Sequence, residues 1–315
     1  MSERPDTLLG PNEPRQMLDP PELQHLQLFF GDANPSEARI YARLPGQPPT
    51  AGRQLVGQVT GPYCEYARTL DDSTPLKHRA ADGQLMAEAV IPDPCFWTPE
   101  LPFQYQVSVE LTISGKAVAR TKRLFAIRPL GPRQKRLYYA GKPWVLRGAC
   151  RAVLPSAPLE VWHSADLAML ADSPDDEVCR TASNLGVMIV AAIAVSGEPV
   201  VGELERLARW PAVALAVVPE TSASAPALRS AGGNVLLAQR FSVEEPVTLA
   251  SWAQVALCEV GARIDEFAKK VADVPIPVIA LGSAGSLMSP VSARLQCDAL
   301  QAALAGSGVY AGYLV

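Results

Sequence analysis

Apolar and polar residues alternate one by one along the first part of the chain. In residues 103–111 the odd-numbered positions, from Phe103 to Leu111, are apolar, and the even-numbered positions are Gln, Ser or Glu. This period of two is typical of a β-strand with one buried face. Similar runs cover residues 26–30, 38–44, 54–60, 85–91 and 117–127. Turn residues separate the runs, and about six or seven such strands predict a β-sandwich.

The rhythm changes at about residue 135, where short runs that are apolar on both faces alternate with helical stretches. Eight strands are predicted, at residues 144–149, 167–171, 187–193, 213–218, 235–238, 254–259, 277–281 and 309–315. Helices are predicted at residues 175–185, 202–209, 261–271 and 290–305. This order indicates a parallel α/β sheet, and eight repeats predict a compact (β/α)8 barrel. A doubly wound open sheet is the alternative, but no GxGxxG follows the first strand.

The chain of 315 residues therefore divides into four parts. We expect a Pro-rich extended arm at 1–23, the sandwich at 24–130, a linker at 131–141 and the barrel at 142–315. The basic run at 133–136 in the linker is interpreted as a solvated hinge. No helix follows the last predicted strand, so we expect another chain or the arm to cover that barrel flank.

Composition narrows the classes of function. Lys plus Arg total 28 and Asp plus Glu total 32, a net charge of −4 that argues against a nucleic-acid binder. The longest apolar run spans residues 187–195, well short of the roughly 20 residues that a membrane span needs. With no signal-peptide core near Met1, the expected location is the cytoplasm. The six Cys and three His are scattered, so neither a metal site nor a cofactor is expected.

Six segments resemble motifs of glycoside hydrolase family 2, and they occur in the family's order. Residues 93–105 (DPCFWTPELPFQY) are similar to a turn of the family's immunoglobulin-like sandwich, W-(S/T)-P-E-x-P-x-L-Y. The other five are similar to the closing sandwich strand and to barrel segments: 123–128 (RLFAIR), 140–148 (AGKPWVLRG), 179–190 (CRTASNLGVMIV), 209–220 (RWPAVALAVVPE) and 275–280 (PIPVIA). The resemblance implies an immunoglobulin-like sandwich followed by a TIM barrel, and it is specific for fold rather than for activity.

The resemblance also places the catalytic positions. Glu220 falls at the acid/base position after the fourth barrel strand, but it follows Pro219, where the family has Asn. Gly282 stands at the nucleophile position, and glycine has no side chain that could attack a sugar. A retaining glycosidase needs two carboxylates about 5–5.5 Å apart, so we expect that this activity has been lost. Glu259, at the end of the sixth strand, is the one substitute, either as a base or as a structural carboxylate.

Three further residues are candidates for ligand binding. Trp162 and His163 follow the first barrel strand and are expected to form an exposed aromatic platform. Arg147 lies inside that strand, matches an Arg of the family, and is expected to form a buried ion pair in the barrel.

Three functions follow from these residues. The favoured one is a family 2-like protein without glycosidase activity that serves as a carbohydrate-binding or scaffold component. The others are a purely structural protein-interaction module and an active O-glycosyl hydrolase with Glu220 as acid and Glu259 as base.

Overall fold

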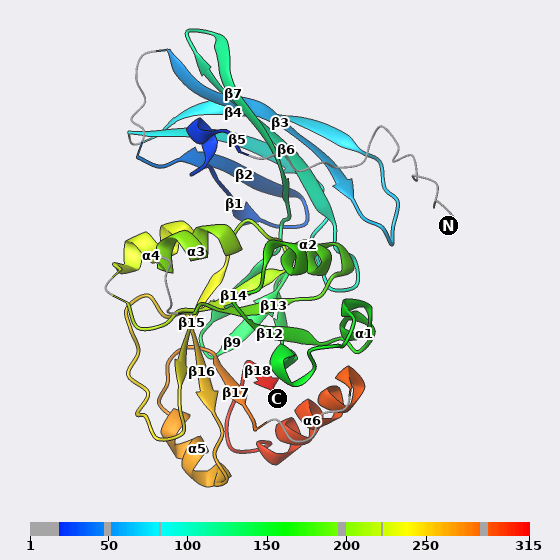
Figure 1. Ribbon diagram of the computed structural model, residues 1–315, viewed down its shortest axis with the longest axis vertical. Coiled ribbons are helices and arrows are strands. Elements are labelled where there is room, and N and C mark those ends of the chain that lie inside the picture. The colour runs from blue at the N-terminus through cyan, green and yellow to red at the C-terminus, as the bar shows by residue number, and fades with distance from the viewer. Residues whose placement is uncertain (1–18, 47–51, 82, 195–199, 222, 284–288) are drawn as a thin grey trace, which may run out of the picture.

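The computed structural model describes residues 19–46, 52–81, 83–194, 200–221, 223–283 and 289–315. The expected arm therefore lies outside the described residues, apart from its last five positions, which include a short 3₁₀ turn at Pro21–Leu23. Figure 1 shows a β-sandwich stacked on a barrel, with α3 and α4 beneath β1.

The sandwich contains seven antiparallel strands: β1 (Gln27–Ala33), β2 (Glu37–Leu44), β3 (Arg53–Tyr63), β4 (Asp72–Ala81), β5 (Gln84–Pro92), β6 (Gln104–Ile113) and β7 (Lys116–Phe125). They pair in the order β1-β2-β5-β4-β3-β6-β7. Strand β4 joins the two layers, because its first half pairs with β3 and its second half with β5. Buried side chains from both layers, such as Ile40 and Val107, belong to one core. The sandwich is thus confirmed; only β4 was missed, because its sequence is largely polar and contains Pro75.

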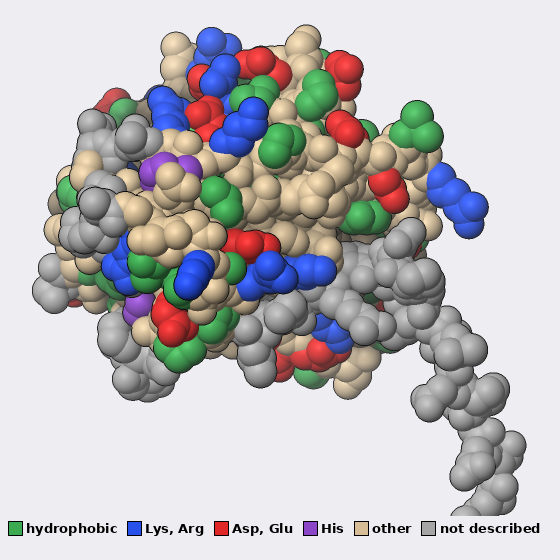
Figure 2. All heavy atoms as spheres, turned by 90° about the horizontal axis from the view of Figure 1, so that it is seen from above, with side chains coloured by type: hydrophobic (Ala, Val, Ile, Leu, Met, Phe, Trp, Pro, Cys, Tyr) green, Lys and Arg blue, Asp and Glu red, His purple; other side chains and the backbone are tan. Residues whose placement is uncertain are grey.

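Charges of both signs are interleaved on the sandwich. Glu88 accepts hydrogen bonds from Arg39 at 3.0 Å and from Arg79 at 2.8 Å, and Arg120 pairs with Glu110 at 2.7 Å. Figure 2, which views the molecule from above, shows the same mixture of basic and acidic side chains.

A small ordered sheet occupies the place of the expected hinge. Strands β8 (Leu130–Arg133), β9 (Arg136–Tyr139) and β10 (Lys142–Trp144) pair antiparallel in the order β10-β9-β8. The Lys135 ammonium donates a hydrogen bond to the carbonyl of Ala272 in the barrel at 2.6 Å. The basic run is therefore the turn of a hairpin fixed against the barrel.

Eight parallel strands close the barrel: β11 (Leu146–Cys150), β12 (Ala168–Asp172), β13 (Ile189–Ala192), β14 (Val213–Val217), β15 (Leu236–Phe241), β16 (Val255–Glu259), β17 (Val278–Leu281) and β18 (Gly312–Leu314). Strand β18 pairs with β11, so the closed barrel is confirmed and the open sheet is wrong. The helices are α1 (Leu159–Ser164), α2 (Asp176–Leu185), α3 (Val200–Leu207), α4 (Ala225–Gly232), α5 (Ile264–Val271) and α6 (Pro290–Ala303).

Helix ends follow their sequence signals. Helix α2 starts at Asp175, whose carboxylate accepts a hydrogen bond from Val178 N at 2.8 Å. It ends at Gly186, which has φ 80°. A Cβ at Gly186 would lie 2.1 Å from the Pro99 carbonyl oxygen, so only glycine lets the sandwich turn sit on this helix end.

The interior of the barrel is apolar except at its carboxyl end. A Cβ on Gly312 would lie 2.7 Å from Leu146 Cβ and 3.3 Å from Ile279 Cγ1, which places these positions inside. Register partners in a parallel sheet share a face, so the interior set can be read around the barrel. It comprises residues 146, 148 and 150; 168, 170 and 172; 190 and 192; 215 and 217; 236, 238 and 240; 255, 257 and 259; 279 and 281; 312 and 314. The charged members are Asp172, Arg240 and Glu259.

The sandwich packs against the amino-terminal ends of the barrel strands. The Asn234 side chain accepts a hydrogen bond from the Phe30 N–H at 2.8 Å and donates one to the Phe30 carbonyl at 2.9 Å. Arg128 is buried and donates to the carbonyls of Pro211 and Val213, and burial lowers its pKa to about 10. Because these barrel residues precede or begin strands β14 and β15, the sandwich lies at the end opposite the barrel mouth.

Helix α6 covers the flank that was expected to be bare. It packs on β11 and β18, and the Cys297 thiol donates to the Gly148 carbonyl at 3.2 Å. Arg294 ties the helix to the end of α1 through Asp166 at 2.8 Å. A covering chain thus has no empty flank to fill between these two strands.

Candidate functional site

The barrel mouth is the first place to look for chemistry, because barrel active sites lie at the carboxyl ends of the strands. Here Arg240 of β15 donates two hydrogen bonds to Oε1 of Glu259 on β16, at 3.0 and 2.7 Å. Both side chains are partly exposed. Glu259 is therefore the partner of an arginine on the neighbouring strand.

Glu220 lies apart from this pair. It is exposed, three residues beyond the end of β14. Within the described part of the chain, its carboxylate forms no hydrogen bond and no ion pair. The structure thus gives no contact that would unite Glu220 and Glu259 in one catalytic pair.

The end of β17 carries no carboxylate in the described residues. A Cβ at Gly282 would lie 3.1 Å from Leu300 Cδ2 of α6, so this position faces the helix layer. The last interior residue of the strand is Leu281, which is buried. Residues 284–288 lie outside the described residues. A side chain at position 282 would therefore point toward α6 and away from the mouth.

Two predictions about ligand-binding residues are wrong. Trp162 is fully buried in the barrel core instead of forming an exposed platform, because the single inward face of the short helix α1 carries it. Arg147 points outward from β11, since it lies between the interior residues Leu146 and Gly148. It bonds Asp298 at 3.1 Å and Gln301 at 2.7 Å on α6, with a quarter of its side chain exposed.

A different tryptophan has the exposure that was expected for Trp162. Of the five tryptophans, only Trp144 is partly exposed; the others are Trp97, Trp162, Trp210 and Trp252. Trp144 lines a cavity of about 290 Å³ together with His163 and Arg147. The signal in the sequence was Trp144 itself, which lies in the family-like segment at residues 140–148.

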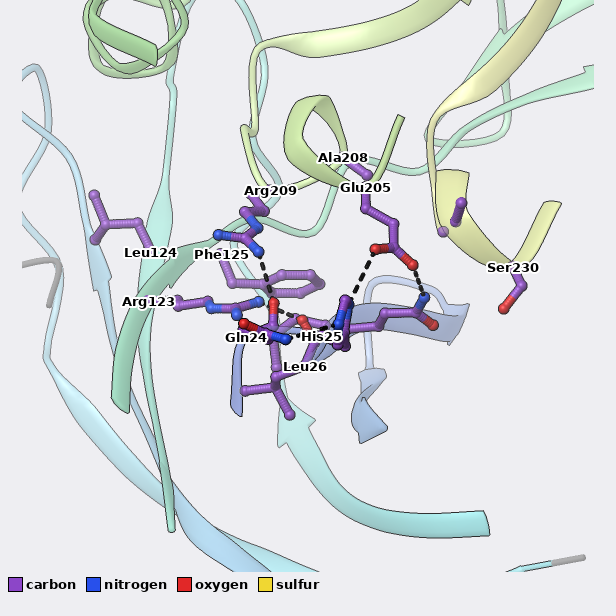
Figure 3. A pocket seen from close by; sticks show the side chains of 14 residues that line it. Gln24, His25, Leu26, Arg123, Leu124, Phe125, Glu205, Ala208, Arg209 and Ser230 are labelled. Carbon is purple, nitrogen blue, oxygen red and sulfur yellow. Dashed lines mark hydrogen bonds and ion pairs between the residues drawn. The ribbon is translucent and has the colours of Figure 1, made fainter. Parts of the chain in front are cut away.

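A narrow cleft separates the sandwich from helices α3 and α4 (Figure 3). Glu205 on α3 accepts a hydrogen bond from Gln27 at 3.1 Å, and His25 lies 3.6 Å from the same carboxylate. At the edge of the cleft, Oδ2 of Asp19 lies 2.6 Å from Nη2 of Arg123 and 3.2 Å from Nη1 of Arg209. The cavity measures only about 30 Å³, about the room of one water molecule. The cleft is therefore a contact between domains rather than a ligand site.

All six cysteines are free. Burial raises the pKa of Cys179 to about 12 and that of Cys258 and Cys297 to about 11. These three buried thiols are therefore protonated and unreactive at neutral pH. No cluster of His, Cys, Asp or Glu able to hold a metal occurs in the described ranges. No helix in those ranges is long and apolar enough to cross a membrane.

Comparison with solved structures identifies the architecture. The chain superposes on a calcium-binding mutant of Bacteroides uniformis beta-glucuronidase 2 with TM-score 0.59 and 16% identity, covering 92% of this chain and 45% of that one. A glycosyl hydrolase family 2 member from Bacteroides cellulosilyticus superposes with TM-score 0.60 and 12% identity, covering 92% of this chain and 43% of that one. The fold is that of glycoside hydrolase family 2.

A third match, Ruminococcus gnavus beta-glucuronidase, has TM-score 0.59 and 11% identity, covering 92% of this chain and 61% of that one. The chain thus spans less than half the length of the first two family 2 proteins. At these identities the likeness concerns the fold, which confirms what the six motifs implied. No family model and no curated protein matches the sequence.

Proposed function

We propose that this glycoside hydrolase-like protein has no glycosidase activity and serves as a carbohydrate-binding or scaffold component. The observation that carries the proposal is the end of β17. There the residue that faces the mouth is Leu281, and the next position, Gly282, turns toward α6. Among the described residues, this strand end offers no carboxylate that could serve as the nucleophile of a retaining mechanism.

The one interior glutamate of the mouth among the described residues is already engaged by an arginine. Arg240 donates two hydrogen bonds to Oε1 of Glu259. No contact between Glu220 and Glu259 occurs in the described residues. The alternative pair of Glu220 and Glu259 is disfavoured for this reason.

The contact between the domains supports the scaffold part of the proposal. Trp97 of the sandwich turn is buried in the barrel core, and its indole N–H donates to the Ser183 carbonyl at 2.9 Å. Gln104 donates to the Asn184 side chain at 3.0 Å. With Arg128, these buried bonds hold the sandwich and the barrel as one unit, which suits a protein that presents fixed surfaces.

A covalent probe tests the missing nucleophile. A cyclophellitol-type aziridine carboxylate binds covalently to Bacteroides uniformis beta-glucuronidase 2, which serves as the positive control. Incubation of this protein with the same reagent is expected to leave its intact mass unchanged. An adduct of one reagent per chain that maps to a carboxylate at the barrel mouth would overturn the proposal.

A further inference from the structure

We propose that a pocket at the junction of the sandwich, the small sheet and the barrel binds a single uncharged sugar ring. This junction pocket has a volume of about 290 Å³, and its lining includes Pro99, Glu100, Trp144, Arg147, His163 and Asp166. The proposal gives a site to the carbohydrate-binding role proposed above, and it rests on that role. The site lies at the amino-terminal end of the barrel, away from the mouth.

The walls of the junction pocket are built on rigid elements. Leu167, Ala168 and Met188 are buried at the starts of strands β12 and β13. Gly186 is in direct contact with Pro99, where any Cβ would collide with the Pro99 carbonyl. The volume lies at the lower end of the range for small-molecule sites, about 300–1,000 Å³. The pocket is therefore preformed and suits one ring rather than a chain of sugars.

Trp144 supplies the flat apolar surface. It is the one partly exposed tryptophan among the five, and Tyr139 packs against it with ring centroids 5.9 Å apart and an interplanar angle of 57°. Val145, Leu167 and Met188 extend the apolar lining beside it. An indole held in place suits a ligand with one hydrocarbon face and a polar edge, as a pyranose ring has.

The charged groups of the pocket favour hydroxyls over ions. Arg147 is already paired with Asp298 at 3.1 Å, and Asp166 with Arg294 at 2.8 Å. An ionised ligand would thus meet charges that are already compensated. Among the described residues, each pair keeps hydrogen-bonding positions without a partner, including Nη1 of Arg147 and Oδ1 of Asp166. A hydroxyl can both donate and accept.

Two further lining residues refine the specificity. Glu100 is exposed and forms no ion pair within the described ranges, so it adds a negative charge that repels uronic acids and sugar phosphates. The His163 ring stacks on Tyr66 with centroids 5.5 Å apart and an interplanar angle of 7°, which fixes a polar ring at the pocket. We therefore expect neutral pyranosides to bind more tightly than glucuronate.

Indole NMR of the full chain tests the site directly. The five tryptophans give five indole N–H signals, and Trp144→Phe assigns that of Trp144 by its loss. Methyl glucoside, methyl galactoside, methyl mannoside and N-acetylglucosamine are titrated to about 100 mM, because a small neutral ring binds in the millimolar range. We expect a saturable shift of the Trp144 signal with at least one sugar, while the four buried indoles stay in place.

Variants separate this pocket from the barrel mouth. Trp144→Ala should weaken binding at least about tenfold, measured by calorimetry. Trp144→Phe should retain most of it, and Arg240→Ala at the mouth should leave it unchanged. Glu100→Lys should shift the preference toward glucuronate without touching the core, so the test does not depend on Trp144→Ala folding.

Three results would overturn the proposal. The first is that none of the four sugars binds saturably. The second is that binding is lost in Arg240→Ala but kept in Trp144→Ala. The third is that the wild type binds glucuronate more tightly than neutral sugars. None of these results bears on the proposed absence of a nucleophile. Labelling by the covalent probe would overturn the proposed lack of activity but would not bear on this pocket.

Discussion

Removal of the Trp97 side chain should weaken the contact between the two domains. It comes from the sandwich turn at 93–105, yet it is fully buried in the barrel core. Its backbone N–H donates to the Ile127 carbonyl at 2.9 Å, its indole donates to Ser183, and its own carbonyl accepts from the Tyr139 hydroxyl. The Trp97→Ala substitution therefore opens a cavity between the two domains.

The size of the loss follows from the burial. Replacing a buried tryptophan by alanine costs about 3–5 kcal/mol. Trp97→Phe keeps most of the ring but loses the indole hydrogen bond, a cost of about 1–2 kcal/mol. The Ser183 carbonyl retains a second donor in that variant, because Gln104 Nε2 lies 3.3 Å from it. The phenylalanine variant should thus stay well above the alanine variant in stability.

Urea unfolding followed by circular dichroism measures both losses. Trp252→Ala is the matched control, because Trp252 is also buried in the barrel core but comes from a barrel segment, whereas Trp97 comes from the sandwich turn. It should lose similar stability in a single transition, whereas Trp97→Ala should separate the unfolding of sandwich and barrel. A Trp97→Ala loss below about 1 kcal/mol would refute the reasoning, since it would mean that this contact does not join the domains.

Three further results are expected. Burial raises the pKa of Tyr105 and Tyr139, so their contribution to stability is complete below about pH 10 and is lost as the pH rises further. Phenolate absorbance should show that both residues ionise only when the protein unfolds, and ionisation before unfolding would contradict this. Ellman's reagent should reach the three buried thiols only after unfolding, and rapid labelling of all six would contradict the packing. Arg240→Ala should change the unfolding free energy by less than about 1 kcal/mol in a urea titration, because the pair is half exposed; a larger loss would contradict that exposure.

The sequence predicted most of the fold because two periodicities are strong in it. In the first half, apolar and polar residues alternate because each strand buries one face. In the second half, the runs are apolar throughout because each strand is buried on both faces. The missed elements have weak patterns: α1 has six residues and α4 eight, and β4 is mostly exposed. The covering of the barrel flank by α6 was also not predicted, because the sequence pattern does not indicate that this helix packs on β11.

The site was harder to predict for a physical reason. A lone aromatic residue on a short helix has no periodic context, so the burial of Trp162 could not be read from its neighbours. The outward direction of Arg147 could have been derived, because alternation with Leu146 and Gly148 dictates it. The junction pocket could not, since its lining comes from segments between Pro99 and Met188 that only the folded domains bring together.

The lack of catalysis is tested most directly by turnover of aryl β-glycosides. The wild-type chain, Glu220→Gln and Glu259→Gln are compared on β-glucuronide and β-galactoside substrates. We expect the three proteins to release the aryl alcohol at the same rate as buffer. Turnover by the wild type that disappears in either variant would contradict the missing catalytic pair and would make the protein an O-glycosyl hydrolase.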